Sequence, residues 1–198
     1  LRFILNAVCS GRGEIVAVRA GEPEAAFREL VAEARELYIK PIRRQYELVV
    51  AGVGYPKGAN LYQASRAATY LYFAPTPVVR PGGVIIIPAR CQEGAGQGVG
   101  ERRCWEALCH APDVQSLLAE MRRRPLQAGE QRAYMLAQVL AFCTVIIVGA
   151  ECPQTVREMK MIPAQDMEEA FSIAAELIGP KADALIVPHA LLTLPVIE

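Results

Sequence analysis

The sequence lacks an excess of charge of either sign and contains very little histidine. Its 198 residues include 21 Lys and Arg against 21 Asp and Glu, so the formal net charge at pH 7 is zero, and there are only two histidines. Binding nucleic acid requires a surplus of basic residues to neutralise phosphates, so this composition excludes a general nucleic-acid binder. Hydrophobic residues make up 53% of the chain, which excludes intrinsic disorder. The length suits one domain or slightly more.

The sequence also lacks a convincing membrane-spanning segment. The longest stretch without charge, Ala133–Ala150, has 18 residues and only reaches the lower limit for a span. Its first part has helical spacing and contains Gln138, whereas Thr144–Val148 is a β-branched run. We therefore interpret it as a buried helix followed by a buried strand and expect no membrane partner.

Cysteine is present, but neither disulfide nor metal-site spacing is. The six cysteines are irregularly spaced, and no CxxC pair occurs, so we interpret them as reduced thiols in a cytoplasmic protein. The nearest approach to a metal cluster is formed by Cys104, Cys109 and His110, which lack the usual zinc-ligand spacing. We interpret these cysteines as small hydrophobic residues that are buried in the core, and we expect no metal on this chain.

The N-terminal 40 residues predict a small unit of their own. Two strand-like runs, 2–9 and 14–20, are joined by a Gly-containing turn and predict an antiparallel hairpin. A helix is expected to begin at Glu22-Pro23 and to end at Pro41. Because the chain begins with Leu in a strand-like run, we expect residues 1–40 to be a remnant of, or linker to, a missing N-terminal domain. The apolar tail at 191–198 is expected to return to that domain.

The central part of the sequence predicts an open parallel sheet. Four short apolar runs are nearly continuous in Val, Ile and Leu, as strands buried on both faces are: Leu48–Gly52, Val84–Pro88, Val145–Gly149 and Ala184–Pro188. Helical segments separate them, including a single helix expected over Asn60–Phe73. The pattern predicts an α/β fold over residues 43–190, with a Rossmann-like sheet of about four strands and helices on both faces.

Ligands of such sheets bind beyond the carboxyl ends of the strands, so the loop after the first core strand is a candidate site. It runs from Gly52 to Arg66, and its helix presents Tyr62, Gln63 and Arg66 near the helix N-terminus. Gln63 and Arg66 are three residues apart and therefore share a face, where an amide and a guanidinium can hold a small carboxylate. The alternative is that both are ordinary solvated surface residues.

The loop after the second core strand, Cys91–Gly100, has four glycines before a helix and can form a backbone nest for an anion. It matches neither the GxGxxG fingerprint nor a P-loop, so a mobile lid is an equal alternative. Cys91 and Glu93 are candidates for a thiolate or a base. His189 follows the fourth core strand, whereas His110 ends a helix and suits its dipole. No Ser/His/Asp triad can be assembled.

Several motifs together resemble the C-terminal half of the nickel-dependent lactate racemase family. The similarity covers nearly the whole chain in order, and its most specific part runs from Gly-Tyr-Pro to Tyr-Gln. The matching segments are Ile4–Val8, Ala20–Pro23, Gly54–Pro56, Asn60–Ala64, Arg80–Ile86, Ala89–Gly94 with the glycines that follow, Val187–His189 and Leu192–Pro195.

The resemblance implies a two-domain racemase or epimerase of 2-hydroxy acids, in which a hydride passes from the substrate to a nickel pincer nucleotide and back. It also implies that the cofactor and the acid and base histidines belong to the N-terminal half, which this sequence does not contain. Tyr62 and Gln63 match substrate-orienting residues, and Arg66 stands where lactate racemases carry lysine. Gln131 is aligned with a tryptophan beside the substrate. These two departures predict a substrate larger or more polar than lactate.

We therefore expect a substrate-orienting C-terminal domain that is inactive without its N-terminal half and carries no catalytic residue of its own. The substrate-binding residues are Tyr62, Gln63 and Arg66. Possible further positions in the site loops are Gly54, Asn60, Cys91, Glu93, Gly94, Gly96, Gln131 and His189. The alternative is a stand-alone α/β module that binds a small anion without catalysis. A third reading is a self-associating domain, since the hairpin and the tail present apolar edges.

Overall fold

The central sheet contains the four predicted strands and one more. The structure is a computed structural model that describes residues 2–198. The strands β4 (Tyr46–Ala51), β5 (Val79–Pro88), β6 (Thr144–Val148), β7 (Ile162–Ala164) and β8 (Ala184–Val187) pair in parallel in the order β7-β6-β5-β4-β8. The predicted open parallel sheet is confirmed, with five strands instead of about four. The sequence pattern missed β7 because it has only three residues and contains Pro163, which an edge strand tolerates.

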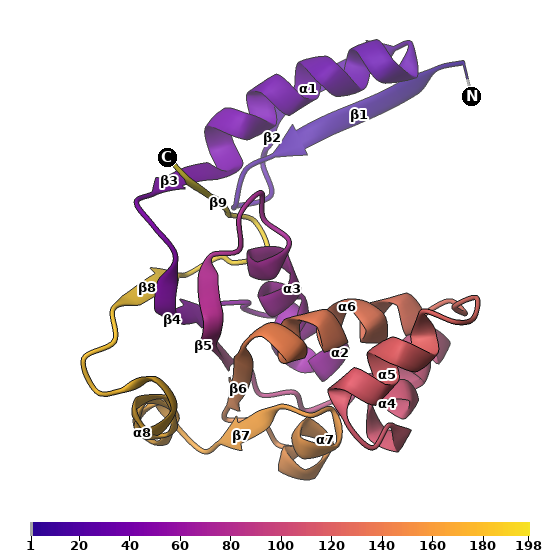
Figure 1. Cartoon of the computed structure of the whole chain (residues 1–198). Coiled ribbons are helices and arrows are strands. Elements are labelled where there is room, and N and C mark those ends of the chain that lie inside the picture. Colours follow the sequence, from indigo (N-terminus) through magenta and orange to yellow (C-terminus); the bar gives the residue numbers. More distant parts are fainter. Residues whose placement is uncertain (1) are drawn as a thin grey trace.

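Successive side chains along each strand point to opposite faces of the sheet. On one face Val49, Ile85 and Ile147 pack with the helices that lie between β4 and β7 in the sequence, whereas on the other Val84 and Ile146 pack with α8 (Met167–Ile178). Figure 1 shows α8 on the opposite side of the sheet from α3 (Arg66–Tyr72) and α6 (Glu130–Phe142). Because β5 and β6 are covered on both faces, these strands are apolar without alternation.

The helices on the larger face lie between the strands in the sequence, as predicted. As expected, Gln138 lies in a partly buried helix that leads directly into β6. None of the helices over residues 2–198 has the length and apolar character of a membrane span. The elements are η1 (Lys57–Ala59), α2 (Leu61–Ala64), α3 (Arg66–Tyr72), α4 (Val99–His110), α5 (Val114–Met121), α6 (Glu130–Phe142) and α7 (Pro153–Glu158).

The single helix expected over Asn60–Phe73 is interrupted. Asn60 caps α2, because its Oδ1 accepts a hydrogen bond of 2.9 Å from the Gln63 backbone N–H. Ser65 then separates α2 from α3, and its hydroxyl donates to the Tyr62 carbonyl at 3.3 Å. Such a side-chain bond competes with the helical ladder and explains the interruption.

The N-terminal unit contains the predicted antiparallel hairpin, β1 (Ile4–Cys9) and β2 (Ile15–Gly21), followed by α1 (Pro23–Tyr38). The helix begins as expected, with the Glu22 carboxylate accepting from the Ala25 N–H, but it ends three residues before Pro41. Pro41 lies within β3 (Ile39–Ile42), which pairs in parallel with the last strand, β9 (Leu194–Ile197). The last strand of the chain therefore lies beside the segment that follows α1 (Figure 1).

Candidate functional site

The two candidate loops lie together beyond the carboxyl ends of β4 and β5. Three backbone hydrogen bonds of 2.9 Å join them, from Cys91 N to Gly58 O, from Glu93 N to Ala59 O and from Leu61 N to Gly94 O. The Asn60 side-chain amide also donates to the Glu93 carboxylate at 3.2 Å. This cross-linking fixes the position of α2, and Asn60 and Glu93 serve mainly to hold the loops.

Gln63 and Arg66 lie side by side across the break between α2 and α3. Arg66 Nη1 donates to Gln63 Oε1 at 3.1 Å, and Arg66 Nη2 donates to the Tyr70 hydroxyl. The Arg66 guanidinium also lies 5.3 Å from the centre of the Tyr70 ring, within the range of a cation–π contact. The side chains that cross the break between α2 and α3 thus form one connected, half-buried group.

A second arginine joins this group from α6. The Arg132 guanidinium lies 5.6 Å from the centre of the Tyr62 ring, and its Nη1 donates to Thr69 Oγ1 at 3.5 Å. Its Nε is buried without a hydrogen-bond partner. Burial lowers the pKa of Arg132; Tyr62 raises it, while the nearby charge of Arg66 lowers it. Arg132 was not among the residues predicted from the sequence.

Arg66 and Arg132, called the arginine pair below, have no acidic partner. The ion pairs formed among residues 2–198 involve other cations, and no carboxylate lies within 4.0 Å of either guanidinium. Two neighbouring cations that lack a counter-charge repel each other, and a bound anion would relieve that repulsion. The arrangement is therefore suited to binding a carboxylate, which a planar guanidinium can hold with two hydrogen bonds.

Gln131, the residue aligned with a substrate-facing tryptophan, does not point into this group. Its side chain is exposed, and its Oε1 accepts a 2.7 Å hydrogen bond from the Gly129 N–H, at the start of α6. The next residue, Arg132, faces α3 instead. One step along a helix rotates the side chain by about 100°, so the two neighbouring residues face different directions.

The remaining predicted positions differ in exposure and backbone conformation. The Cys91 thiol is buried, which raises its pKa to about 12 and makes it a poor nucleophile at neutral pH. The exposed His189 lies in the turn after β8, where its carbonyl accepts from the Leu192 and Thr193 N–H groups, and Gly54 is exposed. Gly94 and Gly96 adopt positive φ, a conformation that favours glycine.

The N-terminus of α4, which follows the glycine loop, is capped by the side chain of Glu101. Glu101 accepts a 2.8 Å hydrogen bond from the Gly98 N–H and packs against Gly96. This carboxylate occupies the position that a phosphate would take in a backbone nest. The loop therefore favours a structural role over nucleotide binding.

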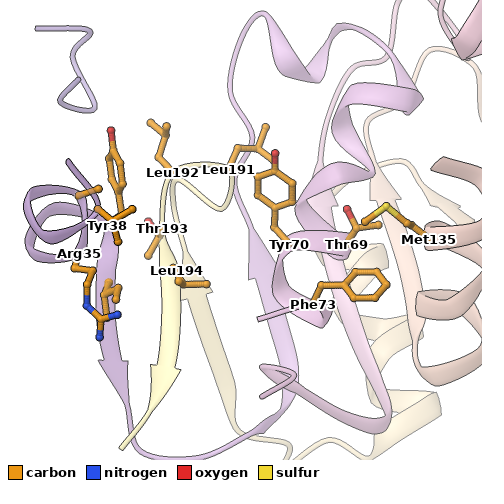
Figure 2. A pocket seen from close by; sticks show the side chains of 13 residues that line it. Arg35, Tyr38, Thr69, Tyr70, Phe73, Met135, Leu191, Leu192, Thr193 and Leu194 are labelled. Carbon is orange, nitrogen blue, oxygen red and sulfur yellow. The ribbon is translucent and has the colours of Figure 1, made fainter. Parts of the chain in front are cut away.

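An apolar cavity lies directly beside the arginine pair. It measures about 660 Å³ and is bounded by α1, α3, α6 and the segment that leads into β9. Figure 2 shows Thr69, Tyr70 and Phe73 on one side, and Tyr38, Leu192 and Leu194 on the other. Thr69 and Tyr70 also accept the hydrogen bonds of Arg132 and Arg66, so the cavity and the arginine pair share these residues.

Comparison with known proteins identifies relatives of the whole chain. Residues 43–194 match the family model described as lactate racemase C-terminal domain. The lactate racemase of Thermoanaerobacterium thermosaccharolyticum is 31% identical over 192 residues, covering 95% of this chain and 43% of that protein. The lactate racemase of Lactiplantibacillus plantarum is 27% identical over 195 residues, covering 96% of this chain and 44% of that protein.

Solved structures give the same result. The lactate racemase apoprotein from T. thermosaccharolyticum superposes with a TM-score of 0.86 at 26% identity, over 99% of this chain and 46% of that chain. A protein from Thermotoga maritima shares the fold with a TM-score of 0.64 at 18% identity, over 99% of this chain and 49% of that chain. This chain spans less than half the length of the two lactate racemases. The family match over most of the chain and the conserved architecture lead to one conclusion: the chain belongs to the lactate racemase C-terminal domain family.

Proposed function

We propose that this chain is the substrate-orienting part of an enzyme that racemises or epimerises a 2-hydroxy acid. The observation that carries the proposal is the arginine pair, which has no acidic partner and lies beside Tyr62 and Gln63. The carboxylate of the substrate would take the place of the missing counter-charge. Membership of a family named for lactate racemase supports a substrate of this class.

The contacts suggest how the group would orient a substrate. Arg66 and Arg132 approach from different helices, so together they would fix both the position and the plane of a carboxylate. The Gln63 Oε1 is already engaged by Arg66, whereas its amide nitrogen donates to no protein acceptor in the part of the chain that the structure describes. That amide would be available to the 2-hydroxyl oxygen, next to the carbon whose configuration changes.

In this proposal the nickel pincer nucleotide implied by the family is held outside this chain. No three His, Cys, Asp or Glu side chains of residues 2–198 form a group that could hold a metal ion. We propose that the cofactor and the acid and base groups come from an N-terminal domain of the same protein. In this proposal residues 1–40 connect to that domain, residues 43–190 form the substrate-orienting domain, and residues 191–198 return towards it. The shorter length of the chain relative to its relatives supports this division. The six free cysteines support a reducing, cytoplasmic setting.

A stand-alone anion-binding module is the second candidate. It is favoured by one observation, namely that the arginine pair makes no hydrogen bond to a histidine or a carboxylate within residues 2–198. The coding sequence upstream of Leu1 distinguishes the two. A histidine-rich, lysine-bearing domain there supports the enzyme, and a start codon close to Leu1 supports the module.

The proposal is tested by titrating the purified chain with L- and D-lactate while following backbone amide shifts by NMR. Binding should perturb Gln63, Arg66 and Arg132, and Arg66→Ala should weaken it by at least tenfold without changing the fold. Arg102→Ala, at an exposed arginine of α4, is the matched control and should bind like the wild type. Absence of binding by every 2-hydroxy acid tried, or binding that Arg66→Ala leaves unchanged, would refute the proposal.

A further inference from the structure

The apolar cavity beside the arginine pair is much larger than lactate requires. Its volume of about 660 Å³ falls within the usual range of sites for drug-sized ligands, about 300–1,000 Å³. Most of its lining is apolar or aromatic, including Val31, Ala34, Phe73, Met135 and Leu194. A methyl group bound at the arginine pair would leave nearly all of this wall in contact with water.

The arginine pair is not part of the cavity wall but contacts three residues that line it. Arg132 Nη1 lies 3.5 Å from Thr69 Oγ1 and 3.9 Å from Met135 Sδ, and both residues line the cavity. Arg66 donates to the hydroxyl of Tyr70, which is also a lining residue. A molecule whose carboxylate meets the two guanidinium groups would therefore have the cavity within reach of its next few carbon atoms.

We infer that the cavity holds the side chain of the substrate, and that the substrate is a 2-hydroxy acid with a large apolar side chain, aromatic or branched. This inference rests on the proposed function and specifies its substrate class. The arginine pair accounts for the acid, and the apolar cavity accounts for the side chain, because burying apolar surface favours binding in proportion to the area removed from water. Arg35 also lines the cavity, from α1, and forms no ion pair among residues 2–198, but most of the remaining wall is apolar, including Leu191, Leu192 and Leu194.

The test compares lactate, 2-hydroxy-4-methylpentanoate and 3-phenyllactate on the 198-residue chain by isothermal titration calorimetry. The two larger acids should bind at least tenfold more tightly than lactate. The amide of 3-phenyllactate, which has the ring without the charge, should bind at least tenfold more weakly than the acid. Ala34→Phe partly fills the cavity from α1 and should abolish the preference while leaving lactate affinity unchanged.

Two further variants keep the test decisive. Ala32→Phe adds the same ring at an exposed position of α1 and should retain the preference. Leu192→Trp narrows the cavity from the opposite wall at a residue that is 46% exposed, so it places little burden on folding and should repeat the effect of Ala34→Phe. Equal affinity for lactate and the larger acids, or a preference that survives both cavity variants, would overturn the inference while the proposed function stands. Failure of all three acids to bind would instead overturn the proposed function.

Discussion

Replacing Arg132 with methionine should separate ligand binding from stability. The substitution removes the guanidinium and keeps an apolar side chain beside Met135. It also loses the cation–π contact with Tyr62 and a long hydrogen bond to Thr69, together worth about 1–2 kcal/mol. Thr69 Oγ1 remains satisfied, because it also donates to the Arg66 carbonyl at 2.9 Å.

Two gains offset that loss. The half-buried guanidinium no longer has to be desolvated, and the repulsion from Arg66 disappears; both effects are visible as a lowered pKa of Arg132. The net change in the free energy of unfolding should be within about 1 kcal/mol, which corresponds to a shift in melting temperature of about 2–4 °C for a chain of this size. Anion binding should fall far more. Loss of a charge-assisted hydrogen bond, about 1.5–3 kcal/mol, weakens affinity by about 10- to 150-fold.

Two assays test this prediction: calorimetry of 3-phenyllactate binding, and thermal unfolding. Each is carried out on the wild type, Arg132→Met and Arg102→Met. Wild-type affinity should decrease as salt is added, and the residual affinity of Arg132→Met should depend less on salt. Arg102→Met should match the wild type in both assays. A large fall in melting temperature with unchanged affinity would show that Arg132 is a structural residue, and the assignment of the arginine pair as the carboxylate site would be wrong.

Three further predictions concern the scaffold. Arg124 holds Glu130 with hydrogen bonds of 2.8 and 2.9 Å and lowers the pKa of this carboxyl to about 2. This stabilisation is complete above the ordinary pKa of 4.5 and is lost as the pH falls towards 2. Glu130→Gln should cost about 1–2 kcal/mol at pH 7, and the free energy of unfolding, measured with urea, should then depend less on pH in the acid range. Gly129→Ala should destabilise by about 2–4 kcal/mol, measured by the same unfolding curves, because Gly129 has φ +101° and an added Cβ would overlap the backbone of Gly100; a stable variant would contradict this close approach. Iodoacetamide at pH 8, followed by peptide mass spectrometry, should label the exposed Cys9 first. It should reach Cys91, Cys104 and Cys143 only in denaturant, since burial raises the pKa of these thiols to about 12. Early labelling of these three cysteines would contradict their burial.

Local sequence patterns predicted most of the elements. The apolar runs at β4, β5, β6 and β8 were recognisable because strands covered on both faces leave no room for alternation. The uncharged stretch from Ala133 was interpreted as a buried helix followed by a buried strand, and in the structure α6 ends at Phe142, just before β6. Gln63 and Arg66 were placed on one face by their spacing alone, and the structure joins them by a hydrogen bond.

Where local spacing did not suffice, the missing information was long-range. β7 was too short to produce a pattern, and its pairing with β6 is what defines it as a strand. Arg132 is 66 positions from Arg66, and only the packing of α6 against α3 brings the two guanidinium groups near one another.

The sequence by itself determined the α/β class, the order of the strands and helices along the chain, and half of the candidate site. These properties depend on residue periodicity, which acts over a few neighbouring positions. The tertiary structure alone decided the second arginine and the apolar cavity, whose walls come from α1, α3, α6 and the segment before β9. Their positions depend on contacts between distant parts of the sequence, because the pairing of β3 with β9 places the segment before β9 near α1, and tertiary packing places both beside α3 and α6.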